Sequence, residues 1–299
     1  MSVSYAYTVK NEICGSDRFE NACCRKAQLY GLVLFSAVYS DNAFKLTTGH
    51  IASALRCAAL INELMGIELK VNILGNGYCV KADGATAKQI FEFMGHDEKE
   101  VALNINHVNF DCESCMSAFA AGAFLACGTV SSPDREYRLE FTSSHKKRLD
   151  DFRVVLEELE VAAHLTQRGN EYVLYTKDSE CIENLLAYMG ATTSALELMS
   201  TKVAKNIRNR ANRHVNVETA NLSRTLASSM KQVEAIEYLI EMDELYKLDG
   251  ELSDIAALRL ANPECSLTQL SKLANISRSV VNSRLKKLEE IAENLRERK

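Results

Sequence analysis

The chain has 299 residues, of which 47% are hydrophobic, with 2 Pro, 13 Gly and a formal net charge of −5. This composition is typical of a folded globular protein and excludes a largely disordered or collagen-like chain. No apolar run approaches the roughly 18 residues that a membrane span needs, and residues 1–10 lack a signal-peptide pattern. We therefore expect a cytoplasmic protein of two or three domains, with no membrane partner and with its 10 cysteines reduced.

Charge is divided unevenly along the chain. Residues 1–200 hold 18 Lys and Arg against 26 Asp and Glu, whereas residues 201–299 hold 17 against 14. Within the second part, residues 201–231 carry seven basic side chains and one acid. Contacts of Lys and Arg with phosphates supply most of the sequence-independent affinity for nucleic acid. A polyanion such as DNA is therefore expected to bind the C-terminal third.

The first two thirds of the chain contain an internal repeat. The segment "QLYGLVLFSA" (residues 28–37) resembles "FAAGAFLACG" (residues 119–128), so that Gly31 matches Gly122, 91 residues later. Two further pairs follow in the same order, "GYCVKAD" with "EYVLYTKD" and "IFEFMGH" with "LLAYMGA". Self-similarity at offsets of 91 to 95 residues, in one order, indicates two copies of one structural unit, at about residues 20–100 and 112–195 of a domain 1–195.

Each copy is predicted to fold as αββαββα, which makes the domain α+β. In the second copy, helical and alternating hydrophobic periods predict, in chain order, a helix at 119–126, a strand at 137–143, a helix at 145–162, a strand at 172–176 and a helix at 180–188. The two remaining strands are expected at 128–130 and in the weakly patterned stretch after the central helix.

These tandem repeats resemble the LAGLIDADG homing-endonuclease fold. In that family two signature helices pack side by side at a pseudo-twofold axis, and each leads into strands of a saddle-shaped antiparallel sheet. Small residues at the helix contact let the two backbones approach closely. Gly31, Ala121, Gly122 and Ala126 fit that role.

The resemblance also implies an acid at the eighth position of each signature, where the nucleases hold a divalent metal. Here these positions are Ser36 and Cys127. Magnesium requires hard oxygen ligands, and metal-assisted phosphodiester hydrolysis needs the ion beside the reacting oxygens. Asp41 and Asp134 follow five and seven residues later and are expected in hairpin turns. We therefore predict no enzyme, with a metal-dependent DNA endonuclease as the alternative.

A short basic cluster in the second copy, Lys146, Lys147 and Arg148, has two interpretations. It is a local DNA-binding surface or a solvated helix face. The net acidity of residues 1–200 favours the solvated face.

Four cysteines occupy related places in the two copies. Cys112 and Cys115 form a CxxC motif, and Cys23 and Cys24 precede the other signature helix; Cys24 and Cys115 each lie seven residues before their glycine. Four thiolates near a pseudo-dyad could hold structural zinc. Adjacent cysteines are not the usual ligand spacing, however, and equivalent helix starts often share a small apolar residue. We predict no metal and no cofactor, with zinc as the open alternative.

The end of the chain, residues 251–299, has the pattern of a helix-turn-helix module. A helix at 252–262 is closed by Pro263, and a second at 266–275 has Ser266 as its N-cap. A third helix begins after Ser277 and is expected to bury Val281, Leu285 and Leu288. Three helices with a short turn between the last two are typical of a DNA-binding module.

Residues 266–288 carry five bases and no acid, which supports DNA as the partner. Asn can read adenine and Arg can read guanine in the major groove, so Arg278, Asn282 and Arg284 are the base-reading candidates. The other predicted DNA contacts are Thr268, Gln269, Ser277, Ser279, Ser283, Lys286 and Lys287. The alternative is a protein-docking module that binds an acidic partner through a basic surface. No small-molecule substrate is predicted.

Residues 196–250 are predicted to form a helical linker with an unusual face of amides and arginines, Asn206, Arg208, Asn209, Arg210, Arg213 and Asn216. This face either lies along a DNA backbone or forms a hydrogen-bonded seam between domains. The helix that follows, 219–242, is expected to pack through Leu222, Leu226, Val233, Ile236 and Ile240.

The whole arrangement resembles the WhiA family of bacterial DNA-binding regulators. The resemblance rests on the degenerate repeats, on "ETANLSRT" (residues 218–225) and on "SRSVVNSRLKKL" (residues 277–288), and it runs nearly end to end. It implies a nucleoid-associated regulator of transcription in sporulation or cell division, which binds promoter DNA mainly through the helix-turn-helix. The endonuclease-like domain would then serve as a scaffold, as a surface for another regulatory protein, or as a second DNA contact.

Overall fold

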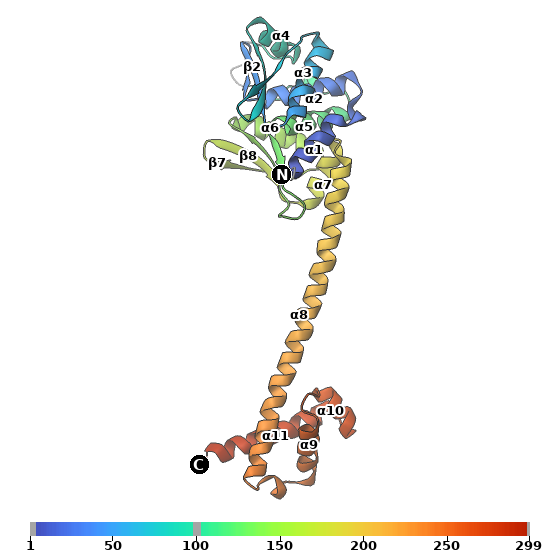
Figure 1. Ribbon diagram of the computed structural model, residues 1–299, viewed down its shortest axis with the longest axis vertical. Coiled ribbons are helices and arrows are strands. Elements are labelled where there is room, and N and C mark those ends of the chain that lie inside the picture. The colour runs from blue at the N-terminus through green and yellow to red at the C-terminus, as the bar shows by residue number, and fades with distance from the viewer. Residues whose placement is uncertain (1–3, 98–102, 298–299) are drawn as a thin grey trace. The chain divides into compact units, whose positions relative to one another are not determined.

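The computed structural model describes residues 4–97 and 103–297 (Figure 1). The chain divides into two compact units, Met1–Lys205 and Asn206–Lys299. The predicted end of the first repeat, near residue 100, and residues 298–299 of the predicted helix-turn-helix domain lie outside the described residues.

The first unit contains the predicted repeat twice, after an N-terminal helix. Helix α1 (Tyr5–Gly15) and a 3₁₀ turn (Asp17–Phe19) come first. The first repeat is α2 (Ala22–Leu34), β1 (Val38–Tyr39), β2 (Ala43–Thr48), α3 (Ile51–Met65), β3 (Val71–Leu74), β4 (Gly77–Asp83) and α4 (Ala85–Phe93). After a 3₁₀ turn (His107–Asn109), the second is α5 (Ser114–Cys127), β5 (Gly128–Val130), β6 (Leu139–Ser143), α6 (Lys146–Glu158), β7 (His164–Arg168), β8 (Glu171–Thr176) and α7 (Ser179–Tyr188). The predicted αββαββα order is therefore confirmed.

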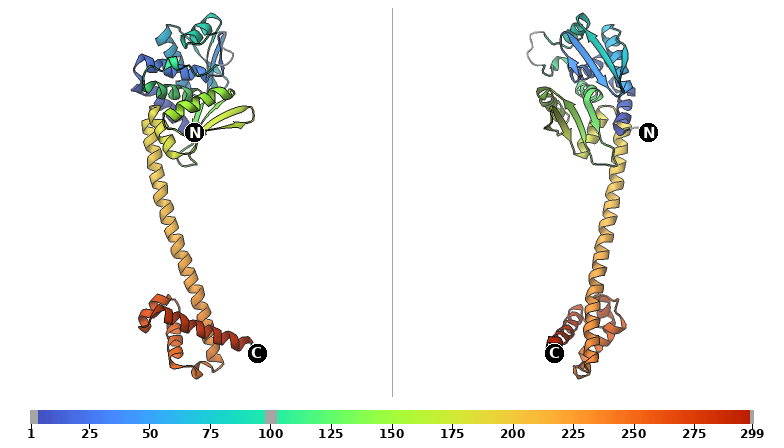
Figure 2. Two further views of the ribbon diagram at one scale, coloured as in Figure 1. Left: turned by 180° about the vertical axis from the view of Figure 1, so that it is seen from behind. Right: turned by 60° about the vertical axis from the view of Figure 1, so that its left-hand side comes forward.

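The strands form two antiparallel four-stranded sheets, one per repeat, which Figure 2 shows next to each other in blue to teal and in green. Their strand orders, β1-β2-β4-β3 and β5-β6-β8-β7, are equivalent. Strand β2 pairs with β4 from Ala43 opposite Asp83 to Thr48 opposite Tyr78, and β6 pairs with β8 in the corresponding way. Matching topology confirms that the two copies are structural repeats.

Two predicted helix boundaries of the second repeat are wrong by several residues. Helix α5, expected from residue 119, begins at Ser114. The central helix of the second repeat, expected to reach Ala162, ends at Glu158. Leu159 caps it, and Glu160 then takes a left-handed conformation with φ of 59°. A residue in this conformation breaks the helical hydrogen-bond pattern, so the continuing apolar pattern belongs to the buried Val161 beyond the helix end.

Helices α2 and α5 cross in close contact at their glycines. A Cβ atom at Gly31 would lie 2.2 Å from the carbonyl oxygen of Phe119, and one at Gly122 would lie 2.0 Å from that of Gln28. Both distances are far below any van der Waals contact. The predicted role of these two glycines in close helix packing is confirmed, and Ala121 is buried beside them.

Helix α8 (Thr192–Glu241) is one continuous element, in place of the separate linker and packing helices that the sequence suggested. Its first part belongs to the first unit and the remainder to the second. Leu222 and Leu226, expected to be buried, are exposed, because the helix enters the second core at Ser229 and not before. Ile236 is buried as predicted, while Val233 and Ile240 are half-buried.

The second unit is helical. A 3₁₀ turn (Leu245–Lys247) follows α8 and leads to α9 (Gly250–Ala261), α10 (Leu267–Ala274) and α11 (Arg278–Glu297). Its core joins Ile236 and Leu239 of α8 to Leu270 of α10 and to Val281 and Leu285 of α11. Over the described residues, no helix combines the length and the apolar character that crossing a membrane requires.

Candidate nucleic-acid interface

The C-terminal ends of α2 and α5 are the places where the signature acids would lie. Ser36 follows the end of α2, and its single hydroxyl proton is shared between the carbonyl oxygens of Val33 (2.7 Å) and Val38 (2.9 Å). Cys127 is the last residue of α5, and burial raises the pKa of its thiol to about 12. A hydroxyl engaged with backbone and a protonated thiol do not supply the oxygen ligands of a magnesium site.

Two basic side chains lie at these same helix ends. The Arg148 guanidinium donates to the carbonyl oxygen of Leu34 (2.8 Å), and the Lys10 ammonium donates to that of Leu125 (3.4 Å). Leu34 and Leu125 are equivalent positions of the two repeats, three residues after each signature glycine. Cationic side chains therefore bind carbonyl groups at the C-terminal, partially negative ends of both signature helices. In a nuclease of this fold, these helix ends face the divalent metal.

Both interpretations of the basic cluster place its three residues at the surface, and for Arg148 this expectation is wrong. Lys146 and Lys147 are exposed, as expected for a solvated helix face, but Arg148 of the same helix is buried. Burial lowers the pKa of its guanidinium, and the carbonyl of Leu34 satisfies one of its donors. Arg148 is thus part of the interior and not of any surface.

The acids that follow the signatures lie in hairpin loops, as predicted. Asp41 is in the β1–β2 loop, where its carboxylate accepts a hydrogen bond from the Asn42 amide (3.1 Å). Asp134 is exposed in the β5–β6 loop.

The predicted helix-turn-helix is formed by α10 and α11, with α9 packed against both. Ser266 caps α10 in a reciprocal capping box with Gln269. Asn275 ends the helix in a left-handed conformation (φ 52°), and the hydroxyl of Ser277 accepts a hydrogen bond from the backbone N–H of Val280 at the start of α11. The predicted caps and the short turn are confirmed.

Helix α11 presents a polar face at its N-terminal half. Val281, Leu285 and Leu288 are buried as predicted. Asn282 is half-buried on the adjoining face, and the exposed side chains are Ser277, Arg278, Ser279, Ser283, Lys286 and Lys287. This set has the donors and the positive charge that contacts with base edges and phosphates require.

Two of the predicted contact residues have partners inside the protein. Arg284 forms an ion pair with Glu251 of α9, so its guanidinium is turned toward that helix. Gln269 uses its side-chain oxygen in the capping box, which leaves its amide NH₂ for other partners; Thr268 next to it is exposed.

A pocket of about 200 Å³ opens beside the N-terminus of α10. Its lining combines three arginines with four hydroxyl side chains: Arg224, Thr225, Ser228, Arg259, Ser266, Leu267, Thr268 and Arg278. Arg259 is 1% exposed, and among the described residues its Nε atom has no hydrogen-bond partner. Its Nη1 atom donates to the carbonyl oxygen of Cys265 (2.6 Å) and to the Ser229 hydroxyl (3.2 Å). Three cations and a helix N-terminus make this pocket suited to a phosphate group.

Sequence reasoning missed Lys10 and Arg259. Arg259 left a signal, because it is a lone arginine inside the apolar segment "IAALRLA" (residues 255–261). Lys10 left none, since it lies outside both repeats and its partner carbonyl is 115 positions away.

The amide and arginine face of α8 is exposed. Every residue from Asn206 to Thr219 is accessible to solvent, including Arg208, Asn209, Arg210, Arg213 and Asn216. Exposed amides and guanidinium groups are donors that a polyanion could bind, and both interpretations of this face remain predictions.

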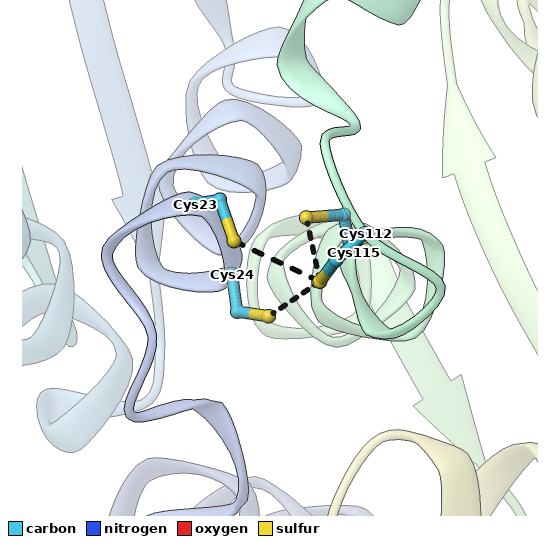
Figure 3. Close-up of side chains that lie close together, drawn as sticks. All are labelled: Cys23, Cys24, Cys112 and Cys115. Atoms are coloured by element: carbon cyan, nitrogen blue, oxygen red, sulfur yellow. Dashed lines mark hydrogen bonds between the residues drawn. The ribbon is translucent and has the colours of Figure 1, made fainter.

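The four cysteines of the two repeats come together. The sulfur atoms of Cys23, Cys24, Cys112 and Cys115 all lie within 4.8 Å of one another (Figure 3). This is the arrangement that the zinc alternative requires.

Comparisons with known proteins give one consistent answer. Residues 116–208 match the model of the WhiA LAGLIDADG-like domain, and residues 211–292 match that of the WhiA C-terminal HTH domain. The "Probable cell division protein WhiA" of Clostridium botulinum (strain Hall) is 30% identical over 99% of both chains. The protein of the same name from Alkaliphilus metalliredigens is 32% identical and covers 97% of this chain and 98% of its own.

Solved structures agree with this fold. The crystal structure of full-length WhiA from Thermatoga maritima covers 98% of this chain and 99% of its own, with a TM-score of 0.59 and 24% identity. That of an N-terminal LAGLIDADG domain of WhiA covers 64% of this chain and 92% of its own, with a TM-score of 0.50 and 18% identity.

Proposed function

This chain belongs to the WhiA family, and we propose that it is a sequence-specific DNA-binding regulator of transcription whose LAGLIDADG-like domain has no nuclease activity. The relatives carry the name cell division protein, so its target promoters would belong to cell division or, as the family resemblance implies, to sporulation. It would act in the cytoplasm at the nucleoid.

The main support for DNA binding is the polar N-terminal half of α11, which lies beside the arginine pocket. The half-buried Asn282 is close in sequence to the exposed Ser279, Ser283 and Lys286, and this supports its assignment to the groove-facing side of α11. We assign base reading to Asn282 and Arg278. Arg284 is left out of this assignment, because its ion pair with Glu251 holds it on the α9 side.

The pocket supplies the phosphate contact of this interface. Arg224 and Arg278 line its rim, and the buried Arg259 keeps its Nε without a partner among the described residues. A backbone phosphate seated at the N-terminus of α10 would fix the register of α11 on the duplex without reading sequence. Lys286, Lys287, Thr268 and the amide of Gln269 would hold neighbouring phosphates, and the exposed face of α8, residues 206–216, would follow the backbone further.

The loss of nuclease activity rests on the ends of α2 and α5. Ser36 and Cys127 replace the acids, and Arg148 and Lys10 already bind the helix-end carbonyls. A divalent cation placed there would meet two positive side chains and no carboxylate at either signature position. The domain then serves as a scaffold for the C-terminal unit or as the surface that another regulatory protein binds.

Selection from a random duplex library with the full chain, followed by binding to the selected site, tests this proposal. With magnesium or manganese present, we expect the protein to retard the duplex in an electrophoretic mobility shift and to leave it uncleaved. The affinity should fall steeply as the salt concentration rises. Cleavage that disappears in Asp41→Ala or Asp134→Ala would contradict the loss of nuclease activity. Recovery of no consensus sequence would instead favour the protein-docking module.

A further inference from the structure

The four clustered cysteines sit where the N-termini of the two signature helices meet. Cys23 and Cys24 lie in the first turn of α2, while Cys112 precedes α5 and Cys115 lies in its first turn. Each repeat thus contributes two sulfur atoms to one point on the pseudo-twofold axis (Figure 3). This point is at the opposite end of both helices from Ser36 and Cys127, so it has no part in the degenerate nuclease site.

The three distances from the Cys112 sulfur to the other sulfur atoms fit one small ion. Cys112 Sγ lies 3.5 Å from Cys24 Sγ, 3.5 Å from Cys115 Sγ and 3.7 Å from Cys23 Sγ. Tetrahedral zinc with bonds of about 2.3 Å holds its thiolates roughly 3.8 Å apart. An iron–sulfur cluster places several atoms between its cysteines and separates them further. A disulfide joins only two sulfur atoms, at about 2.05 Å, whereas the Cys112 sulfur has three sulfur neighbours. The cluster therefore does not have the arrangement of a disulfide.

The helix ends favour the negative charge of a tetrathiolate. Over their described residues, α2 and α5 have neither a side-chain hydrogen bond at the N-cap nor an acid in the first turn. In α5 the backbone N–H of Ser114 is directed at the Cys112 sulfur, whereas that of Cys115 already donates to the carbonyl oxygen of Cys112 (2.9 Å). Each helix N-terminus carries about half a positive charge, and two of them offset roughly half of the net charge of −2 on zinc with four thiolates.

We propose that Cys23, Cys24, Cys112 and Cys115 bind one structural Zn²⁺ that ties the two repeats together at their pseudo-twofold axis. Four protein ligands close the coordination sphere, which is the mark of a structural and not a catalytic ion. Binding replaces up to four thiol protons by the metal, so affinity rises with pH and protons are released. Cys24 and Cys115 are fully buried and Cys23 and Cys112 half-buried, so the ion would be shielded and still reachable from solvent.

Metal analysis of the full chain tests the proposal. Protein purified under reducing conditions is expected to contain about one zinc per chain by mass spectrometry, and Cys112→Ser is expected to lower this content at least about tenfold. Cys181→Ser and Cys265→Ser are matched controls, because both thiols are equally half-buried but lie outside the cluster. Both controls should keep their zinc. Zinc retained in Cys112→Ser, or iron in place of zinc, would overturn the proposal.

Cobalt substitution gives a readout on the unmutated protein that does not depend on whether a variant folds. Chain stripped of metal and titrated with Co²⁺ should develop the intense visible absorption of a tetrahedral tetrathiolate site, saturating at about one equivalent, and Zn²⁺ should bleach it. Absence of this spectrum in reduced protein would also overturn the proposal. DNA binding enters neither measurement, so the outcome is independent of the proposed function.

Discussion

At the scale of single residues, the proposed recognition of DNA bases depends most on the side chain of Asn282. It lies on α11 next to the buried Val281 and is itself half-buried, so the packing of the helix limits its freedom. A bidentate contact of this kind with adenine contributes about 1–3 kcal/mol of discrimination against other bases.

We therefore expect Asn282→Ala to weaken binding to the selected site roughly 5- to 150-fold and to relax preference at one base position. Binding to random duplex should hardly change. Asn294→Ala is the matched control, because Asn294 is exposed near the other end of the same helix. Electrophoretic mobility shifts with both duplexes measure the two effects, and an equal loss on both would contradict base reading.

His50 gives a second residue-scale prediction, on stability. Its Nδ1 accepts the backbone N–H of Ser53 (3.1 Å), and its Nε2 lies 3.0 Å from the amide oxygen of Asn11. Burial, with a smaller effect from Lys10, lowers the pKa of this imidazole to about 4. The folded state thus holds His50 neutral at pH values where the unfolded chain, with a pKa near 6.5, already binds a proton.

The free energy of unfolding of the first unit should consequently fall as pH drops from about 6.5 to about 4, by up to about 3 kcal/mol from this residue. Above pH 6.5 the residue adds no pH dependence. Denaturant titrations across this range should show a shallower pH dependence for His50→Gln than for the unmutated chain. His214→Gln, at an exposed histidine of α8, should leave the profile unchanged; identical profiles for all three would refute the assignment.

At the scale of elements, the crossing of α2 and α5 holds the first unit together. Their backbones touch at Gly31 and Gly122, where even a methyl group has no space. The signature glycines have thus kept their packing role although the acids beside them are gone.

Gly122→Ala should destabilise the first unit by more than about 3 kcal/mol or prevent folding, because its Cβ would overlap the Gln28 carbonyl and force the helices apart. Gly15→Ala should have little effect, since a Cβ there meets nothing within 4 Å. Thermal unfolding followed by circular dichroism compares the two. Similar melting temperatures would contradict the close crossing.

The pocket lined by residues of α8, α9, α10 and α11 gives a second prediction at the scale of elements. Arg224→Ala should weaken binding to specific and random duplex alike and reduce the slope of log K against log salt by about one, because one phosphate contact is lost. Arg296→Ala, at an exposed base paired with Glu234, is the control and should leave the slope unchanged. A loss confined to the selected sequence would show that Arg224 reads bases instead.

At the scale of the whole molecule, much of the fold could be predicted from the sequence, because it depends on patterns among residues that are close in sequence. Hydrophobic periodicity and the offset between Gly31 and Gly122 gave the repeats, and Ser266, Asn275 and Ser277 marked the ends of the C-terminal helices. The unpredicted features depend on contacts across long distances in sequence. Lys10 forms a hydrogen bond with Leu125, and Arg284 forms an ion pair with Glu251. The crossing of two helices brings the adjacent Cys23 and Cys24 close to Cys112 and Cys115.

Spacing alone therefore argued against a four-cysteine site, although the fold brings the four sulfur atoms within 4.8 Å of one another. Similarly, charge counting placed Arg148 on a surface, while the fold buries it against the end of α2. Helix periodicity also overestimated the packing of α8, since Leu222 and Leu226 fit an apolar stripe but precede the second core.

The ratio of affinities of the full chain for its selected duplex and for a scrambled duplex of equal length, measured at one physiological salt concentration, tests the central claim most directly. Specific regulators bind their sites roughly 10³-fold or more tighter than random DNA. We predict a ratio in that range that drops at least about fivefold in Asn282→Ala. A ratio near one for the unmutated chain would contradict the account and identify the basic unit as a non-specific polyanion-binding or protein-docking module.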